Sequence, residues 1–83
     1  MNDLLKQNLR VAAHKLHLQA VQYRKCHDRV IPEALRDFSY TLDSVYEEKM
    51  PWKDALAKLQ VLEKNGSGVD VQIRNILSDN GLI

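Results

Sequence analysis

The sequence predicts an all-α protein, a compact bundle of four helices in which the first helix is the longest. The 83 residues include only 3 Gly and 2 Pro, so few positions interrupt a helix. Apolar residues recur at three- and four-residue steps, as they do on the buried face of a helix. Most of the Gly and Pro residues fall between these periodic segments, where helices begin and end. The length fits a single helical domain over residues 1–83.

The first helix is expected over residues 3–29, a stretch that contains neither Gly nor Pro. Ile31-Pro32 should end it, because a proline disfavours helical geometry in the residue before it. Its apolar residues form one stripe that we expect to face the core: Leu5, Leu9, Ala12, Ala13, Leu16, Ala20, Tyr23 and Val30.

A second helix is predicted over residues 32–49, because proline fits the first turn of a helix. A third is predicted over residues 51–64, between Met50-Pro51 and Asn65-Gly66, a pair typical of helix C-termini. Their apolar stripes are also expected to face the core: Leu35, Phe38, Leu42, Val45 and Tyr46 in the second helix, and Trp52, Ala55, Leu56, Leu59 and Leu62 in the third.

The fourth helix is predicted over residues 68–78, with Val69, Ile73, Ile76 and Leu77 on its buried face. Ser67, followed three residues later by Asp70, resembles a capping box. The alternative is a β-hairpin, because residues 69, 71 and 73 are β-branched and alternate, and Asn80-Gly81 is a turn signal. Residues 51–64 lack the pattern of a partner strand, which favours the helix.

Charge is divided between the first two helices. Residues 1–30 contain six Lys or Arg against two acids, and residues 31–50 contain two against five. Opposite charges of this kind favour antiparallel packing of the two helices. The helical period aligns a basic stripe of Lys6, Arg10, His17 and Arg24. This stripe is either a solvated face that pairs with the second helix, or a track for an acidic protein or a nucleic-acid backbone.

Leu4, Val11 and Leu18 lie seven residues apart, on the side of the first helix opposite its core stripe. Either the third or fourth helix covers them, or another molecule does, since small domains gain stability from association. Among the aromatic residues, Tyr40 lies off the apolar stripe of its helix, and we expect it on an exposed face.

No pattern of catalytic, metal-binding or cofactor-binding residues stands out. His14 and His17 are close enough along a helix to share a metal ion, but no zinc-finger spacing supports them. In Cys26-His27-Asp28 the neighbouring side chains point about 100° apart, which prevents a proton relay between them. We therefore expect no metal, no cofactor and no enzyme activity.

These observations predict a cytoplasmic, non-catalytic, protein-binding regulator, a small inhibitor or adaptor of the size that phages and bacteria make. No segment is long and apolar enough to span a membrane. The expected partner is another protein or, in a homodimer through the first helix, a second copy. The predicted partner-binding residues are Leu4, Lys6, Arg10, Val11, His17, Leu18, Arg24 and Tyr40.

The alternative function is a nucleic-acid-binding transcriptional regulator. The third helix, the turn and the fourth helix would imitate a helix-turn-helix, aided by the basic stripe of the first helix. Gln72, Arg74 and Asn75 of the fourth helix are of the types that read base edges. The acids Asp70 and Asp79 on that helix, and a net charge of only +1, argue against nucleic acid as the partner.

Overall fold

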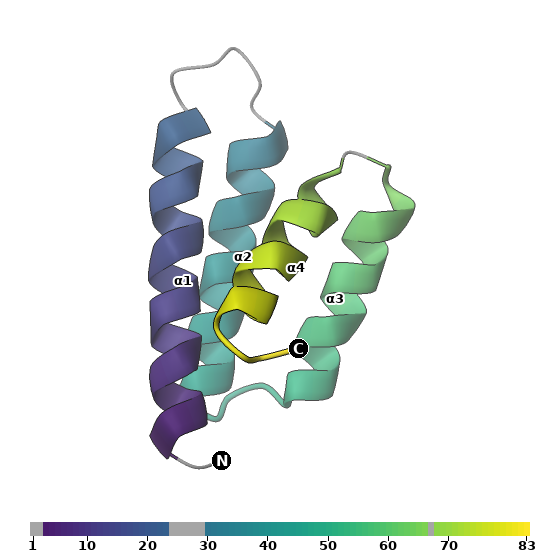
Figure 1. Ribbon diagram of the computed structural model, residues 1–83. Coiled ribbons are helices and arrows are strands. Elements are labelled where there is room, and N and C mark those ends of the chain that lie inside the picture. Colours follow the sequence, from purple (N-terminus) through teal and green to yellow (C-terminus); the bar gives the residue numbers. More distant parts are fainter. Residues whose placement is uncertain (1–2, 24–29, 67) are drawn as a thin grey trace.

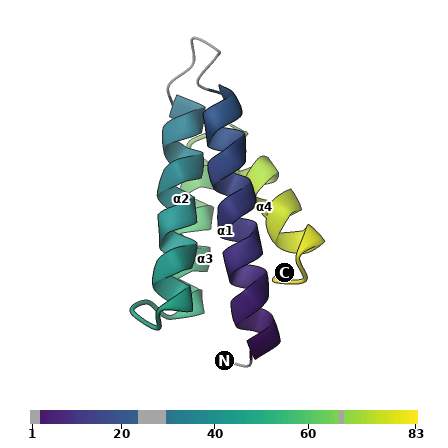
Figure 2. The ribbon, with the colours of Figure 1, turned by 90° about the vertical axis from the view of Figure 1, so that its left-hand side faces the viewer.

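The computed structural model describes residues 3–23, 30–66 and 68–83, and these residues contain four α-helices. They are α1 (Asp3–Tyr23), α2 (Val30–Tyr46), α3 (Trp52–Lys64) and α4 (Val69–Asp79). The prediction of an all-α bundle is confirmed. Figure 1 shows α1 and α2 as one long antiparallel pair and α3 and α4 as a shorter one. In Figure 2, α1 lies nearest to the viewer, with α2 on one side of it and α4 on the other.

The core lies where the apolar stripes of the four helices meet, and each apolar side chain that is buried among the described residues belongs to a stripe that the periodicity predicts. The buried side chains are Leu9, Ala12, Ala13, Leu16 and Ala20 of α1, Leu35, Phe38, Leu42 and Val45 of α2, Ala55 and Leu59 of α3, and Val69, Ile73 and Leu77 of α4. Tyr23 and Trp52 pack against this cluster from its edge, partly buried. The predicted inward faces are therefore correct for these residues, whereas Leu5, which was also predicted to face the core, is 37% exposed in the first turn of α1.

The start of α2 differs from the prediction. The helix begins at Val30 rather than at residue 32, and Val30 is 65% exposed instead of extending the buried stripe of α1. Pro32 is accordingly the third residue of the helix. The N–H groups of the whole first turn have no intrahelical acceptor, so proline is tolerated there beyond the first position. Residues 24–29, the predicted end of the first helix, lie outside the described residues.

The end of α2 also differs, because the helix stops at Tyr46 instead of at residue 49. Glu48 adopts a left-handed backbone with φ of 63°. Its N–H donates to the carbonyl of Val45 at 3.1 Å, and the N–H of Lys49 donates to the carbonyl of Ser44 at 2.9 Å. These two bonds form a Schellman motif, in which the left-handed position is usually glycine.

α3 begins one residue later than predicted and ends at Lys64 as predicted, whereas both ends of α4 lie one residue later than predicted. Pro51 is the extended N-cap of α3, and Gly68, with φ of 80°, is the N-cap of α4 without a side-chain capping bond. Gly68 rather than Ser67 occupies the N-cap position, and Ser67, on which the predicted capping box depends, lies outside the described residues. The alternative hairpin is also wrong, since Val69 and Ile73 are buried one helical turn apart while Val71 between them is 55% exposed.

Candidate functional site

The three aliphatic residues predicted opposite the core stripe are exposed. Leu4 is 66% exposed, Val11 40% and Leu18 48%, so neither α3 nor α4 covers them. Leu9 and Leu16, on the other side of the same helix, are buried. The exposed side, which faces the viewer in Figure 2, is here named the outer face of α1 and consists of Leu4, Gln7, Val11, His14, Leu18 and Val21.

The outer face has the spacing of a coiled-coil seam. Leu4, Val11 and Leu18 occupy one heptad position, and Gln7, His14 and Val21 occupy the position three residues later. All six side chains are exposed in the structure. The face is therefore apolar along one edge and partly polar along the other. Such a mixed face suits a specific helical partner better than a uniformly apolar face does.

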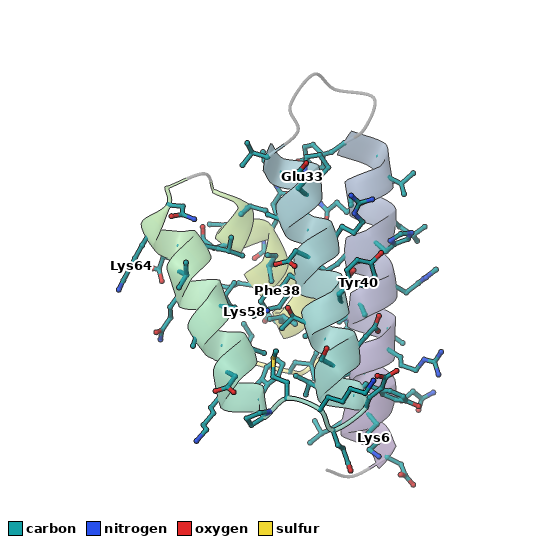
Figure 3. All side chains as sticks on the ribbon, turned by 180° about the vertical axis from the view of Figure 1, so that it is seen from behind. Lys6, Glu33, Phe38, Tyr40, Lys58 and Lys64 are labelled. Atoms are coloured by element: carbon teal, nitrogen blue, oxygen red, sulfur yellow. The ribbon has the colours of Figure 1, made fainter. Side chains whose placement is uncertain are left out.

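The basic stripe of α1 lies along the flank of the outer face that is turned toward α2. Lys6 Nζ lies 3.3 Å from Glu48 Oε1, and the guanidinium carbon of Arg10 lies 5.1 Å from the centre of the Tyr46 ring. Figure 3 shows Lys6 at the end of α1 nearest to the turn that follows α2. His17 is exposed on the same flank, and Arg24 lies outside the described residues. Pairing with α2 thus explains the first half of the stripe.

The opposite flank of the outer face is turned toward α4. There the side-chain amide of Gln19 donates to Gln72 of α4 at 3.3 Å. Lys15 lies exposed between this contact and the outer face, and it has no ion-pair partner among the described residues. Each flank therefore carries one exposed cation close to the centre of the face, Arg10 toward α2 and Lys15 toward α4.

Tyr40 is exposed as predicted, at 58%, but it does not join the outer face of α1. It lies on the outward side of α2, seen in Figure 3. The helical period places it on the same side as the exposed acids Glu33 and Asp37. The predicted partner-binding residues therefore occupy two neighbouring faces, one apolar and basic on α1, the other acidic on α2.

An apolar groove of about 430 Å³ lies beside the N-terminal turns of α1 and α3 and is lined by Leu5, Leu9, Trp52 and Leu82. Figure 1 shows the start of α1 and the C-terminal end of the chain at this end of the bundle. The helical periodicity did not reveal this groove, because it places Leu5 and Trp52 on core stripes and assigns no role to Leu82. Trp52 was the available signal, since Trp combines a large apolar ring with a polar N–H group and is common where one end of the side chain is apolar and the other contacts water.

The residues of α4 proposed to read nucleic-acid bases are mostly engaged within the fold. Gln72 accepts the bond from Gln19, and Arg74 donates to Glu63 Oε2 of α3 at 2.8 Å. Asn75 is exposed. These contacts leave fewer side chains of α4 available for base edges than the sequence alone suggests.

The described residues contain neither a metal-binding cluster nor a membrane-spanning helix. Within residues 3–23, 30–66 and 68–83, no three His, Cys, Asp or Glu side chains gather closely enough to hold a metal ion. His14 and His17 are exposed on α1, while Cys26 and His27 lie outside the described ranges. None of the described helices combines the length and the apolar character needed to cross a membrane.

Comparison with known proteins adds no relative. No protein-family model matches the chain, and neither the curated protein sequences nor the solved structures contain a significant match. The case for function therefore depends on the geometry described above.

Proposed function

We propose that this chain is a non-catalytic protein-binding regulator that docks on its partner through the outer face of α1. The observation that carries the proposal is the exposure of Leu4, Val11 and Leu18, at 66%, 40% and 48%, along one side of a single helix. Three aliphatic side chains aligned at heptad spacing form a continuous strip, whereas isolated exposed aliphatic residues are ordinary on protein surfaces.

The fold supports docking because it holds α1 rigid. The inner side of α1 is fixed by Leu9 and Leu16, which are 1% and 0% exposed, and by α2 along most of its length. A helix held in this way loses little conformational entropy when a partner covers its other side. The chain thus presents a preformed helical surface. A protein of this kind acts as an inhibitor when it occupies a binding surface of its partner, and as an adaptor when it joins two partners.

Affinity capture with two surface variants tests this proposal. Leu18→Lys places a charge within the apolar strip of the outer face, and Val61→Lys makes the same kind of change on α3, where Val61 is 58% exposed. We expect the protein captured by the unmodified chain to be captured equally by Val61→Lys and at least about tenfold less by Leu18→Lys, a difference of about 1.4 kcal/mol. Equal capture by both variants would contradict docking through α1.

A further inference from the structure

We infer that the partner segment seated on the outer face of α1 is an acidic amphipathic helix. This inference rests on the proposed function and specifies its partner. The occupant must match an elongated apolar strip, and it must match the charges that flank the strip. Both requirements can be read from the described residues of α1.

The flanks of the outer face are positively charged. Between Leu4 and Tyr23 the helix contains no Asp or Glu, while Lys6, Arg10 and Lys15 are cationic. Lys6 is paired with Glu48, which leaves Arg10 and Lys15 as the exposed cations nearest to the centre of the face. A partner with Asp or Glu beside its apolar strip would meet a cation on each flank, and such complementarity selects partners and their orientation.

The same charges disfavour a second copy of this chain. In a parallel pair of helices, the residue at the position of Arg10 faces the residue five places later on the other helix, which is Lys15. In an antiparallel pair centred on Val11, equivalent flanks meet and Arg10 lies beside Arg10 of the other copy. Either arrangement opposes like charges, so the face does not complement itself.

The composition of the outer face also favours a protein helix over a lipid surface. Helices that lie in a membrane interface have a broad apolar side, often with Trp or Phe. The outer face of α1 contains no aromatic residue, and Gln7 and His14 interrupt its second row. A helical partner can supply hydrogen-bonding groups opposite these two side chains, whereas the acyl region of a bilayer cannot. We therefore expect the partner helix to carry polar residues at the matching positions.

The proposal is tested with two designed helical peptides, each about three heptads long. Both have Leu at the apolar seam positions, Gln opposite Gln7 and His14, and differ only on their flanks, where one carries Glu and the other Lys. Binding to the intact chain is measured by fluorescence anisotropy at low salt, and the contacted residues are mapped by NMR. We expect the Glu peptide to bind at least about tenfold more tightly than the Lys peptide, with signals of Val11 and Leu18 shifted.

Charge reversal at Lys15 provides the matched control. Lys15→Glu should weaken binding of the Glu peptide by about threefold to tenfold and strengthen binding of the Lys peptide, because one flank changes sign. Lys64→Glu, an identical change at the far end of α3 (Figure 3), should leave both affinities unchanged. Loss of both peptides by Leu18→Lys would place the contact on the outer face.

Three results of the peptide experiment would overturn the acidic helix as partner. They are the absence of measurable binding of the Glu peptide, equal binding of the two peptides, and equal effects of Lys15→Glu and Lys64→Glu. Dimerisation of the chain in sedimentation, or binding to anionic vesicles, that is abolished by Leu18→Lys would assign the face to a second copy or to a lipid surface instead. Dimerisation would overturn the inference about the acidic partner helix but not the proposed function. The proposed function fails if Leu18→Lys leaves capture of the natural partner unchanged.

Discussion

Leu16 and Leu18 provide the sharpest test of how α1 divides its two sides. Leu16 is fully buried among the other helices, and Leu18, two residues later, is 48% exposed. Leu16→Ala removes buried methyl and methylene groups and leaves a cavity, which costs about 3 kcal/mol within a usual range of about 2–5 kcal/mol. A domain of this length has a total stability of about 4–12 kcal/mol, so this single change removes a large part of it.

Leu18→Lys should cost far less, about 0.5 kcal/mol or below. The lysine side chain can lay its methylene stem along the surface that Leu18 now covers and extend its ammonium group into water. No buried group is left unpaired by the change, and surface substitutions of this kind usually stay within about 0.5 kcal/mol. We therefore expect the Leu18→Lys variant to fold like the unmodified chain and to differ from it only on the outer face.

Urea denaturation, followed by circular dichroism and by the fluorescence of Trp52, measures both free energies of unfolding. The two probes should report coincident transitions, with Leu16→Ala unfolding at much lower urea than the unmodified chain and Leu18→Lys close to it. A loss of more than about 1.5 kcal/mol in Leu18→Lys would refute the reasoning, because it would show that Leu18 contributes to the core and that its effect on capture reflects unfolding.

Further changes at three positions test the ends of the helices and one surface contact. Glu48→Gly should raise the melting temperature by about 2–4 °C, because glycine adopts the φ of 63° without strain. This gain outweighs the larger entropy that a glycine loses on folding and the loss of the exposed ion pair with Lys6. Glu48→Ala, which keeps the strain and loses the ion pair, should lower the melting temperature slightly. Gly81→Ala should cost about 1 kcal/mol in urea denaturation through its φ of 70° alone, since the added methyl group meets nothing closer than 3.9 Å. Glu63→Gln should change the free energy of unfolding by less than about 0.5 kcal/mol, because its bond to Arg74 is exposed; a larger loss would show a contact that anchors α4.

The inward and outward sides of the helices could be predicted from the sequence because both depend on one local quantity, the period of 3.6 residues. Leu16 and Leu18 differ by about 200° around α1, and this angle alone separates a core residue from a surface residue. The position of the strip opposite the core was predictable for the same reason. Its exposure was not, because it depends on whether another helix packs over the strip, which only the structure shows.

The helix ends and the contacts between helices could not be predicted in the same way. Glu48 takes a position that usually requires glycine, and nothing in its local sequence signals this. The contact of Arg10 with Tyr46 and the groove between Leu5 and Leu82 join residues far apart in the chain. Such features depend on how the helices settle against one another, which periodicity does not specify.

The contacts within the fold also determine which cations of α1 remain for a partner. Lys6 and Arg10 lie on the flank facing α2, and the carboxylate of Glu48 and the ring of Tyr46 hold them there. Lys15 lies on the flank facing α4 and has no such partner among the described residues. An acidic helix that docks on the outer face would meet Lys15 without competition, but it would have to share Arg10 with Tyr46. The flank toward α4 should therefore contribute more to the electrostatic attraction, which makes Lys15 the better position at which to reverse the charge.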